Sequence, residues 1–176
     1  SRTQLVERAG MDALGTARDP IAEQIRLLKD AGVDFLILET FFHLAEMKVA
    51  LSAAAESGLP TVATMSFRPL VTQCSDGHTP EECARVMADM GAIAVGANCE
   101  QDPPRMLPLL REMRAAVDVP LAAQPAAFHT TDECQIPRDA FTEFGRIAKN
   151  EGIGYAGGCC GCNAAYIRSL ARAAQA

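Results

Sequence analysis

The stretch Asp34-Phe-Leu-Ile-Leu-Glu39 is a short apolar run that lies between two segments of helical periodicity. Continuous apolar runs of this length are typical of strands that are buried on both faces, as in parallel sheets. The preceding residues 21–31 have the apolar spacing of an amphipathic helix that ends at Gly32, and residues 44–57 repeat that spacing up to Gly58. The stretch therefore predicts a strand between two helices, which is the repeating unit of an α/β fold.

The same pattern recurs along the rest of the chain. Further strands are predicted at residues 61–66, 93–98, 120–124 and 154–158, with helices after them at residues 81–90, 104–117, 138–150 and 164–174. Gly91 and Gly152 stand where left-handed helix caps are expected. Thr79-Pro80-Glu81-Glu82 has the form of an N-cap, a proline in the first turn and acidic residues after it.

Successive strand–helix units predict a parallel sheet, either an open doubly wound sheet or a (β/α)₈ barrel. A whole barrel takes about 250 residues, so the 176 residues here fit its C-terminal part, about strands four to eight. Ser1 in place of Met agrees with that expectation, and the whole of residues 1–176 is assigned to this one domain. No Gly-rich phosphate loop follows a strand, which argues against nucleotide binding.

The bulk composition excludes several classes of protein. Hydrophobic residues make up 49% and charged residues 22%, and the net charge of −6 includes no basic stripe of the kind that binds nucleic acid. No apolar stretch reaches the roughly 18 residues of a membrane span, and no signal peptide precedes the first helix. Seven cysteines cannot all pair internally, which favours metal binding or catalysis in a reducing compartment, so we expect a cytoplasmic protein.

The chemically distinctive residues fall where the predicted strands end, and in a barrel those ends converge on the rim that carries the active site. They are Glu39, Met65-Ser66, Asn98-Cys99, Gln124-Pro125 and Cys159-Cys160. Three thiolates with one open position form a common type of catalytic zinc site, so Cys99, Cys159 and Cys160 are predicted metal ligands. We expect the neighbouring glycines, Gly157, Gly158 and Gly161, to allow the sharp turn that this requires.

The cysteines also have simpler interpretations. A buried cysteine such as Cys99 often serves as a small apolar residue. Cys159 and Cys162 form a C-x-x-C pair, which also occurs in redox proteins, although that interpretation leaves Cys99 and Cys160 without a role. Cys74, Cys83 and Cys134 are predicted to lie in loops or helices, and no role is assigned to them.

The remaining polar rim residues allow two interpretations each. An unpaired carboxylate within an apolar run would be costly, so Glu39 is either a solvent-facing or salt-bridged strand end or a group that binds a substrate ammonium. Its position on the rim favours the second role. His43 and His129 also lie in rim loops, where hydrogen-bonded or surface roles are more common than metal binding.

Two motifs resemble the paired zinc-binding signatures of the homocysteine S-methyltransferase family. They are Val95-Gly-Ala-Asn-Cys99 and Gly157-Gly-Cys-Cys-Gly161. Asp34-Phe-Leu-Ile-Leu-Glu39, Ala63-Thr-Met65 and Gln124-Pro-Ala-Ala-Phe-His129 also resemble the betaine–homocysteine branch of that family. The resemblance extends over essentially the whole chain.

The resemblance implies a (β/α)₈ barrel in which Cys99, Cys159 and Cys160 hold Zn²⁺ and the homocysteine sulfur takes the fourth position. It implies that Glu39 binds the substrate's amino group and that Asn98 contacts the substrate or steadies the site. The implied reaction moves a methyl group from an onium donor to homocysteine, giving methionine. Homocysteine and a small methyl donor are the expected partners, a homo-oligomer is compatible with the sequence, and nucleic acid and membrane are not expected.

The chain departs from the family pattern at three places, and these leave the donor open. The first strands are absent. Cys162 with Asn163-Ala164-Ala165 replaces a continuation in which proline is common, and Thr40 stands where the betaine branch carries tyrosine. S-methylmethionine, another sulfonium such as dimethylsulfoniopropionate, and methylfolate delivered through a corrinoid partner therefore remain alternatives to betaine. A zinc-binding half-barrel without activity of its own and a C-x-x-C redox protein are the competing interpretations.

Overall fold

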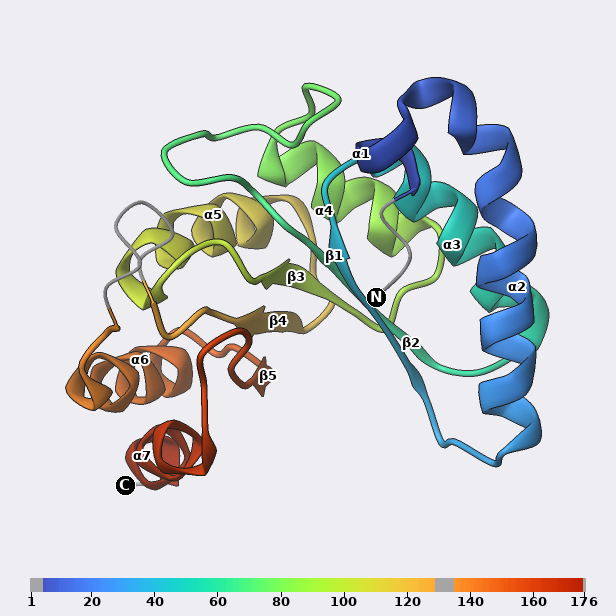
Figure 1. Cartoon of the computed structure of the whole chain (residues 1–176). Coiled ribbons are helices and arrows are strands. Elements are labelled where there is room, and N and C mark those ends of the chain that lie inside the picture. The colour runs from blue at the N-terminus through green and yellow to red at the C-terminus, as the bar shows by residue number, and fades with distance from the viewer. Residues whose placement is uncertain (1–4, 129–134, 176) are drawn as a thin grey trace.

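The computed structural model describes residues 5–128 and 135–175. Within them, five strands form one parallel sheet in which each strand pairs with the next along the chain (Figure 1). The strands are β1 (Leu36–Phe41), β2 (Thr61–Met65), β3 (Ala94–Asn98), β4 (Leu121–Gln124) and β5 (Tyr155–Ala156). The edge strands of the sheet are β1 and β5.

A helix follows each strand, as the apolar pattern predicts. These helices are α3 (Leu44–Ser57), α4 (Pro80–Asp89), α5 (Pro103–Ala116), α6 (Arg138–Asn150) and α7 (Ala164–Gln175). Before β1 the chain forms α1 (Leu5–Ala9), the 3₁₀ helix η1 (Met11–Ala13) and α2 (Leu14–Asp30). The predicted helix over residues 21–31 starts too late, because α2 continues through Pro20 and buries Ala17.

Sequential strand order distinguishes a barrel segment from a doubly wound sheet, in which the order reverses at a switch point. The sheet keeps the order β1-β2-β3-β4-β5, and the helices lie along its outer side in Figure 1. The predicted fold class is therefore confirmed: the chain is a run of βα units arranged as part of a (β/α)₈ barrel.

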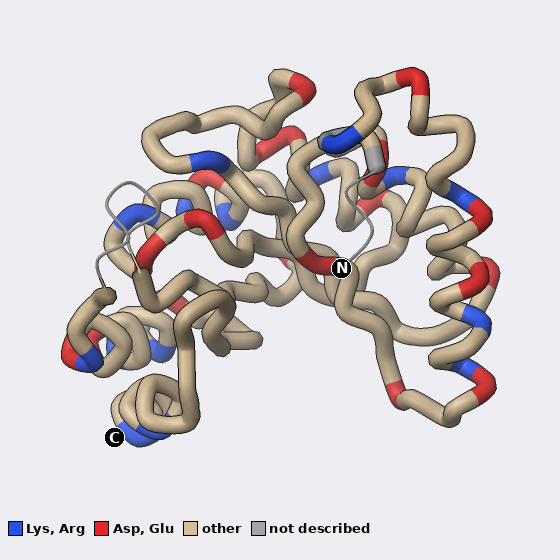
Figure 2. Tube along the Cα trace, viewed as in Figure 1, with Lys and Arg blue, Asp and Glu red and all other residues tan. Residues whose placement is uncertain are grey.

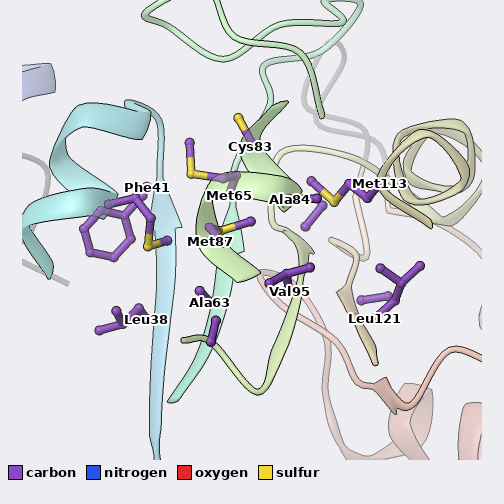
Figure 3. Close-up of a cluster of buried hydrophobic side chains, with 14 of the residues drawn as sticks. Leu38, Phe41, Ala63, Met65, Cys83, Ala84, Met87, Val95, Met113 and Leu121 are labelled. Carbon is purple, nitrogen blue, oxygen red and sulfur yellow. The ribbon is translucent and has the colours of Figure 1, made fainter. Parts of the chain in front are cut away.

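The two faces of the sheet are buried by different partners. Side chains such as Leu38, Ala63, Val95 and Leu121 belong to the large core that also contains helix residues of α4 and α5, shown in Figure 3. On the opposite face Val62, Ala94 and Ala122 form a separate small cluster with Ile37, made of strand residues alone. The inner face of the sheet is thus lined in part by a small apolar cluster that contains no helix residue.

Most charged residues are placed where this architecture leaves them in water, whereas Glu46 and Asp102 are buried. The charged residues are spread over helices and loops with both signs mixed, and strands β2 to β5 carry none (Figure 2). The predicted start of α4 is also observed, since the side chain of Thr79 and that of Glu82 form a reciprocal capping box. Among the described residues, no helix is both long and apolar enough to cross a membrane.

Candidate metal centre

The ends of β3 and β5 bring three cysteines together. Cys99 follows the last residue of β3, and Cys159 and Cys160 lie in the loop that follows β5. Their sulfur atoms all lie within 4.8 Å of one another, with 3.4 Å between the Sγ atoms of Cys99 and Cys160 and 4.0 Å between those of Cys159 and Cys160. Cys99 is buried and Cys160 is exposed, so the cluster is accessible from one side.

Backbone hydrogen bonds between adjacent loops hold the cysteines in place. The Cys99 amide donates to the Gln124 carbonyl at 3.0 Å, and the Cys159 amide donates to the Pro125 carbonyl at 2.9 Å. In return, the Ala127 amide donates to the Cys160 carbonyl at 2.8 Å. The C-terminal end of β4 therefore lies between the segment that contains Cys99 and the segment that contains Cys159 and Cys160, and it fixes their separation.

The backbone at this rim is strained. Cys99 and Glu100 have φ values of 58° and 56°, and Thr40 at the end of β1 has a φ of 65°. Such values are uncommon outside glycine, cost about 1–3 kcal/mol each and persist only where the surrounding structure enforces them. The glycine expectation is only partly met: Gly161 has a φ of 78°, but Gly157 and Gly158 are not among the left-handed residues. Gly158 instead leaves room for the Cys162 sulfur, which would lie 2.6 Å from an added Cβ.

Asn98 connects three strands and one of the cysteines. Its Oδ1 accepts from the Thr40 amide and from the Thr64 hydroxyl, both at 2.8 Å. Its Nδ2 donates to Thr40 Oγ1 at 2.8 Å and lies 3.8 Å from the sulfur of Cys159. The family resemblance implies either a substrate contact or a role in steadying the site for Asn98, and a fully buried side chain bonded to the protein favours the second.

Glu39 is exposed on β1 and is not the last residue of that strand, which continues to Phe41. The register changes between Leu38 and Phe41, so that the residues between them form a bulge opposite β2. Bulges redirect side chains and are common beside active sites. Exposure removes the burial cost that the sequence suggested for this carboxylate, and the group remains available to a ligand.

The thiols of the cluster influence one another's ionisation. A hydrogen bond from Cys99 lowers the pKa of Cys159, and the same contact together with burial raises the pKa of Cys99. Burial also raises the pKa of Cys160. Within the cluster, Cys159 is therefore the thiol that ionises most readily.

Other residues predicted on the rim have different surroundings. His43 occupies the N-cap position of α3. The sulfur of Cys162 lies 3.7 Å from the Pro125 carbonyl, and burial raises the pKa of Cys162 to about 11. His129 and Cys134 lie outside the described residues.

Several polar contacts at the rim were not predicted. The Ser66 hydroxyl donates to the Asn98 carbonyl at 2.8 Å, and Gln101 Nε2 donates to the carbonyls of Phe67 and Arg68. Gln124 Oε1 is buried without a hydrogen-bond partner among the described residues. Ser66 and Gln124 could be found from the sequence as rim residues because each is a polar residue at the end of an apolar strand. No local sequence pattern indicates that Gln101 binds the carbonyls of Phe67 and Arg68.

The comparisons with known proteins agree on one family. A family model described as homocysteine S-methyltransferase matches residues 10–174. A betaine–homocysteine S-methyltransferase 1 of Xenopus tropicalis is 34% identical over 172 residues, which cover 85% of this chain and 42% of that protein. An S-methylmethionine–homocysteine S-methyltransferase of Pongo abelii is 33% identical over 174 residues, with 85% of this chain and 47% of the relative covered.

Solved structures give the same picture of the fold. The metallated form of the homocysteine methyltransferase MmuM from Escherichia coli superposes with a TM-score of 0.71 at 19% sequence identity, covering 90% of this chain and 52% of that one. At this identity the likeness concerns the fold alone. The chain spans about half the length of the relatives and structures that it matches.

Proposed function

The chain belongs to the homocysteine S-methyltransferase family, and we propose that it carries the zinc- and homocysteine-binding rim of an enzyme that methylates homocysteine to methionine. The observation that supports this most strongly is the cluster of Cys99, Cys159 and Cys160, whose sulfur atoms lie within 4.8 Å of one another. Because the chain spans 42% of the betaine relative, we propose the activity for a complete barrel to which this chain contributes the C-terminal strands.

The donor set and its spacing suit zinc. Tetrahedral coordination with Zn–S bonds of about 2.3 Å places neighbouring sulfurs roughly 3.8 Å apart. The sulfur of Cys160 lies 3.4 Å from that of Cys99 and 4.0 Å from that of Cys159, on either side of that value, and all three sulfurs lie within 4.8 Å of one another. Three thiolates also leave one coordination position for the sulfur of a substrate, as in other catalytic zinc sites.

When bound there, Zn²⁺ would keep the homocysteine thiol deprotonated at neutral pH, since a free thiol has a pKa near 8.5. The protein's own residues supply the rest. The Nδ2 atom of Asn98 approaches the sulfur of Cys159 and helps to hold it in place. The exposed carboxylate of Glu39 binds the ammonium group of the substrate. The buried Gln124 Oε1, without a partner among the described residues, is a further polar contact for a bound substrate.

The transfer itself is a displacement at carbon. The homocysteine thiolate attacks the methyl carbon of the donor while the bond from that carbon to the onium nitrogen or sulfur breaks, and the electron pair leaves with the donor. The thiol proton has already passed to solvent. The catalytic contribution of the protein is therefore alignment of the two reactants and exclusion of competing geometries.

The methyl donor is proposed to be an onium compound. The relatives include enzymes named for betaine and for S-methylmethionine, so family membership is compatible with both. Thr40 in place of the tyrosine of the betaine branch favours a sulfonium donor over betaine. A methylfolate-dependent homocysteine module is the alternative within the same family.

The C-x-x-C interpretation is less well supported. Cys159 belongs to the three-sulfur cluster, whereas Cys162 lies against the Pro125 carbonyl with its pKa raised by burial. A redox pair normally needs an exposed thiol of lowered pKa partnered by the second cysteine. The cluster therefore favours metal binding.

Elemental analysis of the purified, reduced chain tests the proposal, with Cys99→Ser as the test variant and Cys162→Ser as the matched control. We expect about one zinc per chain in the wild type and in Cys162→Ser, and a large loss in Cys99→Ser. Zinc retained by Cys99→Ser but lost from Cys162→Ser would overturn this assignment of ligands. Homocysteine binding that depends on the bound zinc would then extend the test to the substrate.

A further inference from the structure

A second pair of thiols lies outside the proposed metal centre. Cys74 is in the loop between β2 and α4, and Cys83 is in the first half of α4. Their sulfur atoms are 3.8 Å apart, and Figure 3 shows Cys83 at the edge of the core cluster. We propose that Cys74 and Cys83 are a redox modification site, which a peroxide converts to a disulfide by reacting first at Cys74.

The backbone holds both cysteines in position. The Cys74 amide donates to the His78 carbonyl, and the Gly77 amide donates to the Cys74 carbonyl, each at 2.9 Å. Cys83 lies one turn into α4, and its amide donates to the carbonyl of the N-cap residue Thr79 at 2.9 Å. A disulfide requires the sulfurs to approach to about 2.05 Å. Starting from 3.8 Å, the two sulfurs therefore have to approach by about 1.8 Å.

Asp76 secures the loop to the rest of the fold. Its two carboxylate oxygens accept from the amides of Leu44 and Ala45 at 2.9 Å each, so it caps α3 from a distant part of the chain. The same carboxylate accepts from the Cys74 thiol at 2.9 Å. The loop is thus fixed at Asp76, two residues after Cys74, and this keeps Cys74 beside Cys83.

The two thiols differ in access and in ionisation. Cys74 is only 5% exposed, and it lines a cavity of about 750 Å³ that the loop forms between Arg68 and Gly77, which is the route by which a small molecule reaches the thiol. Cys83 has no exposed surface. The hydrogen bond from Cys83 lowers the pKa of Cys74 and outweighs burial and the Asp76 carboxylate, which both raise it, while the contact with Cys74 raises the pKa of Cys83. The thiol that a small oxidant can reach is therefore also the one that ionises more readily.

The chemistry balances with one peroxide per pair. The Cys74 thiolate attacks one oxygen of hydrogen peroxide, breaking the O–O bond and giving a sulfenic acid, and the second oxygen leaves as water after taking up a proton. The Cys83 thiol then attacks the sulfenic sulfur, forming the S–S bond and releasing a second water. Two thiols are oxidised by two electrons, peroxide is reduced, and a dithiol reductant reverses the change.

The disulfide is detected in the zinc-loaded full chain after brief treatment with hydrogen peroxide and alkylation of the remaining thiols. A glutamate-specific protease combined with trypsin cuts after Glu81, Glu82 and Arg85, which separates Cys83 from both Cys74 and Cys99, so the linked pair yields two joined peptides. We expect most chains to contain this link, about 2 Da lighter than the sum of the reduced peptides, and to lose it with dithiothreitol. Alkylation of both cysteines at every peroxide dose, or a link from Cys74 to any other cysteine, would overturn the proposal.

Two variants test the order of the steps. In Cys83→Ala the sulfenic acid on Cys74 has no partner, so dimedone should label Cys74; in Cys74→Ser, Cys83 should remain unlabelled. Equal labelling of the two sites refutes Cys74 as the first thiol to react. The circular dichroism of each variant verifies its fold, and the wild-type peptide map decides on the disulfide itself even if Cys83→Ala fails to fold. The outcome does not depend on the proposed methyl transfer.

Discussion

Replacing Gly96 with alanine should both destabilise the sheet and weaken metal binding, although Gly96 is not a proposed ligand. A Cβ on Gly96 would lie 1.7 Å from the carbonyl oxygen of Ala122 on the neighbouring strand. Carbon and oxygen atoms in close contact are ordinarily about 3.3 Å apart, so β3 and β4 would have to separate by roughly 1.6 Å. The clash is between the added Cβ and the backbone of Ala122, so no flexible side chain can move aside to relieve it.

The cost follows from what that separation breaks. The amide of Val95 donates to Pro120 at 3.1 Å and that of Cys99 donates to Gln124 at 3.0 Å, both across the β3–β4 pair. Losing two such bonds costs about 1 kcal/mol each, and the overpacking itself adds about 1–3 kcal/mol. The total of about 3–5 kcal/mol is a large part of the stability of a typical domain. Cys99 would move with β3, and metal sites tolerate displacements of only about 0.2 Å.

Gly157→Ala is the matched control, because a Cβ there would meet only Gln124 Cγ at an ordinary 3.5 Å. Urea unfolding followed by circular dichroism should place Gly96→Ala far below the wild type and Gly157→Ala within about 1 kcal/mol of it. Zinc content should fall in the first variant and persist in the second. If Gly96→Ala unfolds at the same urea concentration as Gly157→Ala and keeps its zinc, the close approach of β3 and β4 is not what positions Cys99.

Three further substitutions test the cap of α3 and the rim: Asp76→Ala, Glu39→Gln and Asn98→Ala. Burial raises the pKa of Asp76, but hydrogen bonds from Cys74 and from the start of α3 outweigh it and hold that pKa below its ordinary value. The stabilisation is therefore complete above about pH 4 and lost as the pH falls through the lowered pKa, so Asp76→Ala should cost about 1–2 kcal/mol at neutral pH and progressively less in acid. Unfolding curves at several pH values measure this, and a cost independent of pH would contradict it. Glu39→Gln should weaken homocysteine binding to the zinc-loaded chain about fivefold in calorimetry without changing zinc content, the modest size reflecting an exposed charge. Unchanged affinity would remove Glu39 from the substrate site. Asn98→Ala leaves the Thr40 amide and other groups without their partner and should cost about 2–4 kcal/mol in urea unfolding. A cost below 1 kcal/mol would show that the network around Asn98 contributes little.

The order of strands and helices was predictable because each buried strand is a continuous apolar run and each helix has apolar spacing of its own. The meeting of Cys99 with Cys159 and Cys160 was also predictable, since parallel strands in a barrel end at the same rim. Parallel strands alone therefore bring together Cys99 and the Cys159–Cys160 pair, which are sixty residues apart in sequence.

What could not be predicted depends on contacts between distant residues. The bulge that keeps Glu39 from ending its strand coincides with the left-handed conformation of Thr40, whose amide and hydroxyl both bind Asn98 on β3. No local pattern in residues 34–41 contains that partner. The pairing of Cys74 with Cys83 likewise results from a loop conformation fixed by the Asp76 cap of α3, which has no periodic signature in the sequence.

The strained residues and the buried amide of Asn98 form one system. Thr40 and Cys99 both have positive φ values, and left-handed backbone costs an L-residue about 1–2 kcal/mol. Thr40 is held by two bonds to Asn98, and Cys99 is held by the bond of its amide to Gln124 and by its position directly after Asn98. The same Asn98 amide approaches the sulfur of Cys159. One buried side chain therefore stabilises the strained turn beside Glu39, directly precedes one proposed ligand and contacts another.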